Sequence, residues 1–304
     1  CPDAWFLNYT NPMAMLTGGM LLGMGVKTVG LCHSVQGCAR GLLWQVGMHE
    51  EPGEVQAKIA GINHMAWLLE ITRDGQDLYP EIKRRAAKIV RDARRPGAEK
   101  HRNMVRLEIM RHFGYYVTES SEHMAEYTPY WIKSRFPELI EEFNIPLDEY
   151  PRRSERAIRK WEEVRREVVK NRKLKHKRGI EYGSRIMEAM ETNVPLQIGG
   201  NVLNHGLITN LPPKACVEVP CLVDRNGVQG TYIGELPEAC AALNRTSINV
   251  QLLTLEAFFT GKKEHVYQAA MLDPHTGSEL TLDQIRNLCD DLIEAHGSWL
   301  PKFK

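Results

Sequence analysis

The feature that most constrains this fold is a strand–helix–strand pattern in the first 31 residues. Residues 4–8 form a short apolar run that fits a strand buried on both faces. Asn11 and Pro12 resemble a helix N-cap and first helical residue, and the pattern after them predicts a helix to about residue 22. Residues 26–31 form a second apolar run. A βαβ unit this short predicts two parallel strands, with a ligand crevice beyond their carboxyl ends.

The sequence pattern of the rest of the chain predicts a single α/β unit. Beyond residue 40 helical and strand patterns alternate, without an internal repeat or a low-complexity linker. Strands are expected at 62–72 and within 195–235, with a turn at Asp74-Gly75. Helices are expected at 34–48, 79–95, 103–113, 151–178, 236–260 and 279–296.

Composition excludes several classes of protein. The 39 Lys and Arg against 38 Asp and Glu give a formal net charge of +1, which gives no reason to expect nucleic acid as a partner. No apolar run reaches the ~20 residues that a membrane span needs. The seven cysteines include no CxxC pair. They predict neither a disulfide scaffold nor a structural zinc site, and they favour a reducing compartment, the cytoplasm.

One segment departs from this even charge. Residues 151–178 hold 13 Lys and Arg against 4 Asp and Glu. A basic arm for nucleic acid is the alternative, but Ile158, Trp161, Val164 and Val168 recur at heptad-like spacing. That spacing favours an amphipathic helix with a solvated basic face.

The glycines after the first helix do not form a dinucleotide-binding loop. Gly23 and Gly25 precede a predicted strand, whereas the fingerprint must follow one, and Thr28 stands where a third glycine is required. We interpret the pair as a helix C-cap. No other stretch has the form G-x-G-x-x-G, so the sequence contains no phosphate cradle.

Three residues near strand ends are candidate metal or catalytic groups. Cys32 and His33 follow the second strand, and His64 lies near the start of another. A thiolate and an imidazole can bind a divalent transition metal together, with water or substrate oxygens completing the shell. The alternative is a free buried cysteine and a core histidine.

Residues 114–131 combine aromatic and acid–base side chains. They include Tyr115, Tyr116, Glu119, His123, Glu126 and Tyr127. These are candidate catalytic and substrate-binding groups. The alternative is an aromatic face turned to the core with the acids in solvent.

Residues 198–213 form an amide-rich stretch, with Asn201, Asn204, His205 and Asn210 among Gly and Pro. Such side chains suit hydrogen bonding to sugar hydroxyls, and we take Asn204 and His205 as substrate-binding candidates. The alternative is a set of ordinary turns.

Five motifs, in order along the chain, resemble those of one family. They read NYTNPMAM, GLCHSVQG, GINHMAW, GYYVTESSEHMAEY and LNRTSINVQ followed by HVYQAAMLDP. Together they are similar to the family-four glycoside hydrolases, and within them to the α-galactosidases of the melibiose-cleaving type. The resemblance implies an NAD- and manganese-dependent glycosidase. NAD takes hydride from sugar C3, a base removes the C2 proton, the C1–O bond breaks by elimination, water adds, and the hydride returns.

The resemblance also implies roles for individual residues. Cys32 and His64 match the manganese ligands, and Asn11 matches the substrate-binding residue of the family's Asn-Pro motif. His33 takes the position of an aspartate that is a proposed general acid in members of other specificity. The C2 base is often a tyrosine, for which the candidates are Tyr115 and Tyr116. Glu119 and His123 are taken as further substrate-binding residues.

Members of the family begin with a Gly-rich Rossmann half that binds NAD, and no such half is present here. The resemblance therefore implies a truncated chain. Residues 1–40 would be the last strands of a Rossmann-type parallel sheet. Residues 41–304 would be a large α/β (α+β) substrate- and metal-binding domain of the lactate-dehydrogenase-like C-terminal type. We expect these 304 residues alone to bind NAD poorly and to be inactive.

The expected function of the intact enzyme is hydrolysis of terminal α-galactosides such as melibiose, by a homo-dimer or homo-tetramer. Within the family the alternative is an α-glucuronidase or α-galacturonidase, whose members share the Cys-His pair. A second class is an NAD-dependent hydroxy-acid dehydrogenase, which would lack the metal cysteine and the TESSEH stretch. A third is an inactive fragment that serves only in oligomerisation or sugar binding.

Overall fold

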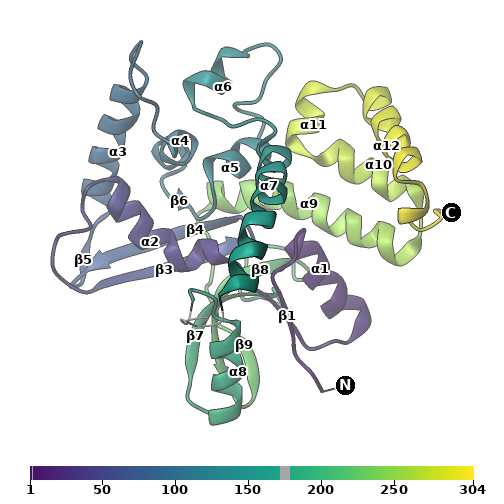
Figure 1. Ribbon diagram of the computed structural model, residues 1–304, viewed down its shortest axis with the longest axis horizontal. Helices are drawn as coiled ribbons and strands as arrows, with labels where there is room; N and C mark the ends of the chain where they lie inside the picture. Colours follow the sequence, from purple (N-terminus) through teal and green to yellow (C-terminus); the bar gives the residue numbers. More distant parts are fainter. Residues whose placement is uncertain (2, 172–178) are drawn as a thin grey trace.

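The computed structural model, which describes residues 1, 3–171 and 179–304, is built on one mixed β-sheet (Figure 1). The strand order is β1-β2-β7-β8-β3-β4-β5, with β6 paired to β4 and β9 paired to β8. The strands are β1 Phe6–Asn8, β2 Thr28–Gly30, β3 Val55–Ile62, β4 Met65–Arg73, β5 Gln76–Asp77, β6 Tyr116–Val117, β7 Leu196–Leu203, β8 Cys216–Asp224 and β9 Gly227–Gly230.

The helices cover this sheet and extend beyond it. They are α1 Met13–Gly19, α2 His33–Gln45, α3 Tyr79–Ala93, α4 Met104–Phe113, α5 Ser121–Glu126, α6 Glu138–Glu142, α7 Glu149–Lys170, α8 Gly183–Thr192, α9 Glu238–Thr260, α10 Lys263–Leu272, α11 Pro274–Glu279 and α12 Leu282–His296. Figure 1 shows α9 to α12 gathered on one side of the molecule and α3 and α4 on the other. The long helices at 79–95, 103–113, 236–260 and 279–296 are confirmed within a few residues, whereas α5, α6, α8, α10 and α11 were not predicted.

The N-terminal βαβ unit is confirmed. β1 and β2 pair in parallel, with Phe6 opposite Thr28 and Asn8 opposite Gly30. The helix between them continues as a π-helical turn over Met20–Met24 and ends at Gly25, whose φ of 62° lies in the left-handed region. This ending confirms the C-cap interpretation of the glycine pair.

The sheet is mixed, because the β1–β2 pair is parallel and the pairs that follow it are antiparallel. A mixed sheet surrounded by helices confirms the expected α/β class. β2 pairs with β7 in antiparallel direction at Gly30 and Asn201, and each following pair of neighbours, β7–β8, β8–β3 and β3–β4, is also antiparallel. Residues 1–40 thus share one sheet with the rest of the chain. The division at residue 40 stays a prediction.

The predicted strand at 62–72 is wrong at its start, because a hairpin turn lies inside it. β3 ends at Ile62, the chain turns at Asn63 and His64, and β4 begins at Met65. His64 has a φ of 63°, so it forms this turn without a glycine. Only the second half of β3 is buried, and its first half, VQAK, contains no continuous apolar run that would predict a strand. The turn expected at Asp74-Gly75 is confirmed, with φ values of 48° and 81°.

The central strands are tied to α9 by a pair of buried hydrogen bonds. The Trp67 indole Nε1 donates to Asn244 Oδ1 at 3.1 Å, and Asn244 Nδ2 donates to the Met65 carbonyl at 2.7 Å. Trp67 and Met65 on β4 are both fully buried in the main hydrophobic core. These bonds therefore hold α9 against β4 inside the main hydrophobic core.

The basic segment is a helix as far as the structure describes it. α7 ends at Lys170, and residues 172–178 of the predicted helix lie outside the described part. Ile158, Trp161 and Val168 are exposed, and no residue of α7 is buried. Within the described ranges, every helix is too short or too polar to cross a membrane.

Candidate active site

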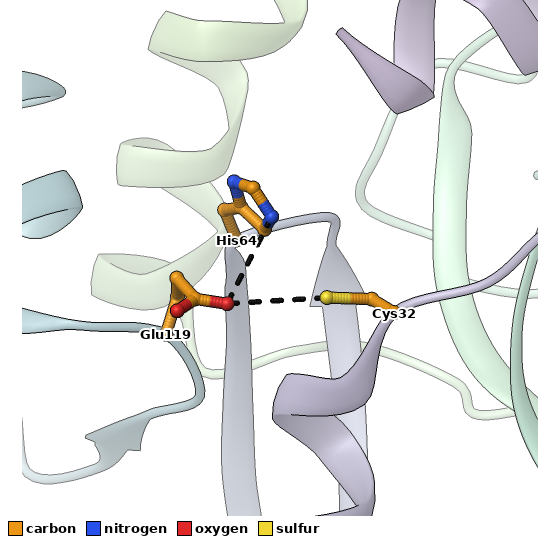
Figure 2. A group of neighbouring side chains, drawn as sticks. All are labelled: Cys32, His64 and Glu119. Atoms are coloured by element: carbon orange, nitrogen blue, oxygen red, sulfur yellow. Dashed lines mark hydrogen bonds and ion pairs between the residues drawn. The ribbon is translucent and has the colours of Figure 1, made fainter. Parts of the chain in front are cut away.

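Three side chains from separate parts of the chain converge at one edge of the sheet. Cys32 follows β2 and precedes α2, His64 forms the β3–β4 turn, and Glu119 follows β6. β6 pairs with β4, which brings Glu119 beside His64. One ligand atom from each of the three lies within 4.8 Å of the others. Figure 2 shows the Glu119 carboxylate directed between the His64 ring and the Cys32 sulfur.

The distances within this cluster suit a shared cation. Glu119 Oε2 lies 3.9 Å from Cys32 Sγ and 3.8 Å from His64 Nε2. On the other side of the ring, His64 Nδ1 lies 3.3 Å from the Tyr127 hydroxyl, which orients the imidazole. We call Cys32, His64 and Glu119 the metal cluster. Glu119, taken from the sequence as a substrate-binding residue, is its third member.

The chemistry of these donors fits a divalent transition metal. Sulfur, imidazole nitrogen and carboxylate oxygen are all ligands of such ions. Burial lowers the pKa of His64, which favours the neutral ring that a metal requires. Burial, with the Glu218 carboxylate second, raises the pKa of Cys32 to about 11. A bound cation would reverse that shift, because it favours the thiolate.

A pocket of about 500 Å³ opens beside the metal cluster. It lies beyond the carboxyl ends of β1 and β2, at the edge where the βαβ pattern places a ligand crevice. Besides the metal cluster, the pocket is lined by Tyr9, Asn11, His33, Arg106, His123 and Arg153. Asn11, His33 and His123 were substrate or catalytic candidates from the sequence, and the structure brings all three to this pocket.

Two histidines of the pocket are oriented by carboxylates. His33 stacks on Tyr9 with ring centroids 5.2 Å apart, and its Nε2 lies 2.8 Å from Glu181 Oε2. His123 stacks on His64 at 4.9 Å, and its Nδ1 lies 2.9 Å from Glu126 Oε2. That hydrogen bond raises the pKa of His123. Both rings are therefore held in place as candidate proton carriers.

The structure places neither Tyr115 nor Tyr116 in this pocket, which corrects the position expected for the tyrosine base. Tyr116 lies opposite Leu68 in the sheet, is fully buried, and donates to Gln45 Oε1 at 3.0 Å. Burial raises the pKa of Tyr116 to about 12. Tyr115 packs edge-on against Tyr79, at 5.9 Å. Both rings belong to the aromatic packing that the sequence allowed as the alternative.

Asn204 and His205 also lie away from the pocket. Asn204 is fully buried, and its side chain bonds the carbonyls of Ile208 and Leu211 at 2.9 Å each. His205 follows it with a φ of 42° in an exposed turn. β7 runs antiparallel to β2, so its carboxyl end lies at the opposite edge of the sheet from Cys32. These residues form a turn and not a sugar site, as the alternative interpretation held.

A buried carboxyl group that the sequence did not single out lies in the sheet near this site. Glu218 on β8 is 1% exposed, and Asn201 Nδ2 donates to its Oε1 at 2.9 Å. Burial raises the pKa of Glu218 to about 8. Its Oε2 and the Asn201 Oδ1 have no hydrogen-bond partner within the described ranges. Its position inside an apolar strand, CVEVPC, is the signal that could have found it.

Tyr182 fixes the backbone of the metal-cluster cysteine. Its hydroxyl accepts from the Cys32 N–H at 3.0 Å and lies 3.1 Å from the Cys32 carbonyl. We expect Tyr182→Phe to lower the free energy of unfolding by about 1–3 kcal/mol, because the buried Cys32 N–H loses its partner. Urea denaturation measures this, with Tyr232→Phe at an exposed position as the control. Equal stability of the two variants would contradict this role.

Models of one protein family match most of the chain. The family 4 glycosyl hydrolase C-terminal domain matches residues 59–276, and the family 4 glycosyl hydrolase model matches residues 1–48. An α-galactosidase from Bacillus subtilis is 61% identical over the whole chain, which spans 68% of that relative. An α-galactosidase from Rhizobium meliloti is 33% identical over 99% of the chain and 62% of its own length. An α-galacturonidase from Lachnoclostridium phytofermentans is 26% identical over 99% of the chain and 68% of its own length.

Solved structures share the fold. The lplD glucosidase structure from Bacillus subtilis has a TM-score of 0.84 and 25% identity, covering 96% of this chain and 69% of that one. A 6-phospho-α-glucosidase from gut microorganisms, solved with NAD and Mn²⁺, has a TM-score of 0.76 and 18% identity, covering 100% and 69%. With matching family models over both parts of the sequence and a relative this similar along its whole length, the chain belongs to glycosyl hydrolase family 4.

Proposed function

We propose that this chain acts in the hydrolysis of terminal α-galactosides, as the substrate- and metal-binding part of an NAD- and metal-dependent α-galactosidase. The observation that carries the proposal is the 61% identity to an α-galactosidase over all 304 residues. The pocket beside the metal cluster supports it, because sulfur, nitrogen and oxygen donors face the same space as Asn11 and His33.

In this proposal Cys32, His64 and Glu119 hold the metal. When bound, the metal supplies Lewis-acid polarisation of sugar oxygens. Asn11 offers its amide to a sugar hydroxyl at the pocket wall. His33, oriented by Glu181 at 2.8 Å, holds the proton for the departing glycosidic oxygen. His123 stacks on His64 and holds the plane of that ring.

NAD is assigned to the enzyme and not to residues of this chain. The sequence contains no G-x-G-x-x-G loop, so these residues do not fit the NAD pyrophosphate. The structural relative solved with NAD and Mn²⁺ supports the cofactors at the level of the family.

One observation favours a second substrate class, the α-galacturonides. Arg153 on α7 lines the pocket, and its charge acts on the Glu122 carboxylate without forming a hydrogen bond or close ion pair in the described ranges. Arg106 also lines it, but its guanidinium is engaged by the Val117 and Thr118 carbonyls at 2.7 and 2.8 Å. Arg153 is thus a cation available to a sugar carboxylate.

We also propose a cytoplasmic enzyme that forms a homo-oligomer. The support for the compartment is the cysteine usage of the sequence, seven cysteines without a CxxC pair. Exposed apolar side chains such as Phe258, Leu282 and Trp299 lie on the C-terminal helices and support an interface there. Sedimentation at micromolar concentration measures the oligomeric state.

The substrate assignment is tested by comparing p-nitrophenyl α-galactoside with p-nitrophenyl α-galacturonide. The assay contains Mn²⁺, NAD⁺ and a thiol reductant, and uses the full-length enzyme. We expect a higher kcat/KM for the galactoside, and deuterium incorporation at C2 of the product in D₂O. Turnover that persists after NAD⁺ and metal are removed would contradict the proposed mechanism. A higher kcat/KM for the galacturonide would replace the substrate assignment.

A further inference from the structure

A second cavity, of about 550 Å³, lies outside the pocket of the metal cluster. It is formed by α4, the end of α3, the chain before α6 and α6 itself, elements that lie near one another in Figure 1. Its lining shares no residue with the pocket described above. The two cavities are therefore distinct, and nothing in the proposed reaction uses the second.

The wall of this cavity is aromatic. Phe113 lies 6.4 Å from Tyr130, Tyr130 lies 5.6 Å from Trp131, and Trp131 lies 6.0 Å from Phe143, measured between ring centroids. Trp131 and Phe143 are buried, whereas Tyr130 is 42% exposed. The Tyr130 ring is therefore available to pack against the apolar face of a ligand.

The acidic group that lines this cavity is Glu108, a glutamate more than nine-tenths buried, and Arg94 and His112 line it as well. Its Oε1 accepts from Arg111 Nη2 at 2.9 Å and lies 3.3 Å from His112 Nε2. Its Oε2 is buried and has no hydrogen-bond partner in the part of the chain that the structure describes. A buried acceptor without a partner is unfavourable, so this oxygen favours an incoming hydroxyl or N–H donor.

The charges around the cavity balance. Arg111 pairs with Glu108, and Arg94 pairs with both acids, its Nε 2.5 Å from Glu142 Oε1 and its Nη1 3.8 Å from Glu108 Oε1. A cationic or anionic ligand would upset this balance, whereas a neutral ligand would not. The site therefore suits a neutral molecule that has hydroxyl donors on one edge and an apolar face.

We propose that this cavity is a second, non-catalytic site for a neutral sugar. One sugar hydroxyl donates to Glu108 Oε2, and the apolar face of the ring packs on Tyr130. The volume of about 550 Å³ lies within the range of small-molecule sites. The proposal does not depend on the catalytic assignment, because binding here is separate from turnover.

The test follows the indole N–H signal of Trp131 by NMR during titration with methyl α-D-galactopyranoside. The signal is assigned by its loss in Trp131→Phe. We expect a saturable shift in the wild-type chain, and in Cys32→Ser, which alters only the other pocket. Tyr130→Ala and Glu108→Gln should weaken binding at least about tenfold, the effect of losing one buried contact. Tyr150→Ala, on exposed α7, is the matched control and should leave the affinity unchanged.

Three results would overturn the proposal. The first is an indole signal that does not move with the sugar. The second is a Tyr130→Ala chain that binds as tightly as the wild type; this variant decides the question even where Glu108→Gln does not fold. The third is a shift with tetramethylammonium in place of the sugar, which would assign the aromatic wall to an organic cation.

Discussion

Cys32→Ser is expected to abolish the stabilisation of this chain by Mn²⁺. A ligand that binds only the folded state raises the free energy of unfolding by about 2.7 kcal/mol at a hundredfold excess over its Kd. The metal cluster loses its sulfur donor in this variant, so the gain should fall to near zero. Urea denaturation in the presence of a thiol reductant, with Mn²⁺ or with a chelator, measures the difference.

Matched variants separate metal binding from packing. His64→Ala and Glu119→Gln should also lose most of the gain, because the first removes one of the three donors within 4.8 Å and the second removes the charge of another. Cys1→Ser changes an exposed thiol away from the cluster and should keep the full gain. An equal gain in Cys32→Ser and in the wild type would show that Cys32 is not a ligand.

Glu218→Gln is expected to make the chain more stable at pH 8 than the wild type. Burial raises the pKa of Glu218 from 4.5 to about 8, so between these values the folded chain binds more protons than the unfolded chain. The contribution of Glu218 is therefore complete below pH 4.5 and is lost as the pH rises through 8. At about 1.4 kcal/mol for each pKa unit, the loss is at most about 5 kcal/mol.

The neutral glutamine removes this dependence. Its amide also offers a donor to Asn201 Oδ1, which has no partner among the described residues. The free energy of unfolding is measured with guanidinium at pH 5, 6.5 and 8. As the pH rises, the value for the wild type should fall relative to the value for Glu218→Gln. Glu294→Gln, at an exposed position on α12, controls for the loss of one carboxyl group. Parallel pH profiles for wild type and Glu218→Gln would contradict a buried neutral acid.

The sequence predicted best where a pattern was local. The βαβ unit follows from two apolar runs and one helix within 31 residues, and it places Asn11, Cys32 and His33 at one edge of the sheet. The long helices follow from their periodicity for the same reason. His64 was chosen from its motif, and the structure brings it to Cys32.

Prediction was poorest where pairing between distant strands decides a side chain's direction. Tyr116 points into the core because β6 pairs with β4, and Asn204 lies at the far edge because β7 is antiparallel to β2. Neither pairing is visible in a local pattern. The place of Glu119 in the metal cluster depends on the same β4–β6 pairing. The sequence therefore singled out Glu119 as a site residue but did not predict that it lies beside Cys32 and His64.

The separation of the metal cluster along the chain has a consequence for folding kinetics. Cys32 and Glu119 are 87 positions apart, and the sheet joins them through β2, β7, β8, β3, β4 and β6 in that order. Contacts of such long range form slowly, because loop closure precedes the gain from pairing. A refolding chain therefore acquires affinity for the metal late, and Mn²⁺ capture is a time-resolved signal for completion of the sheet.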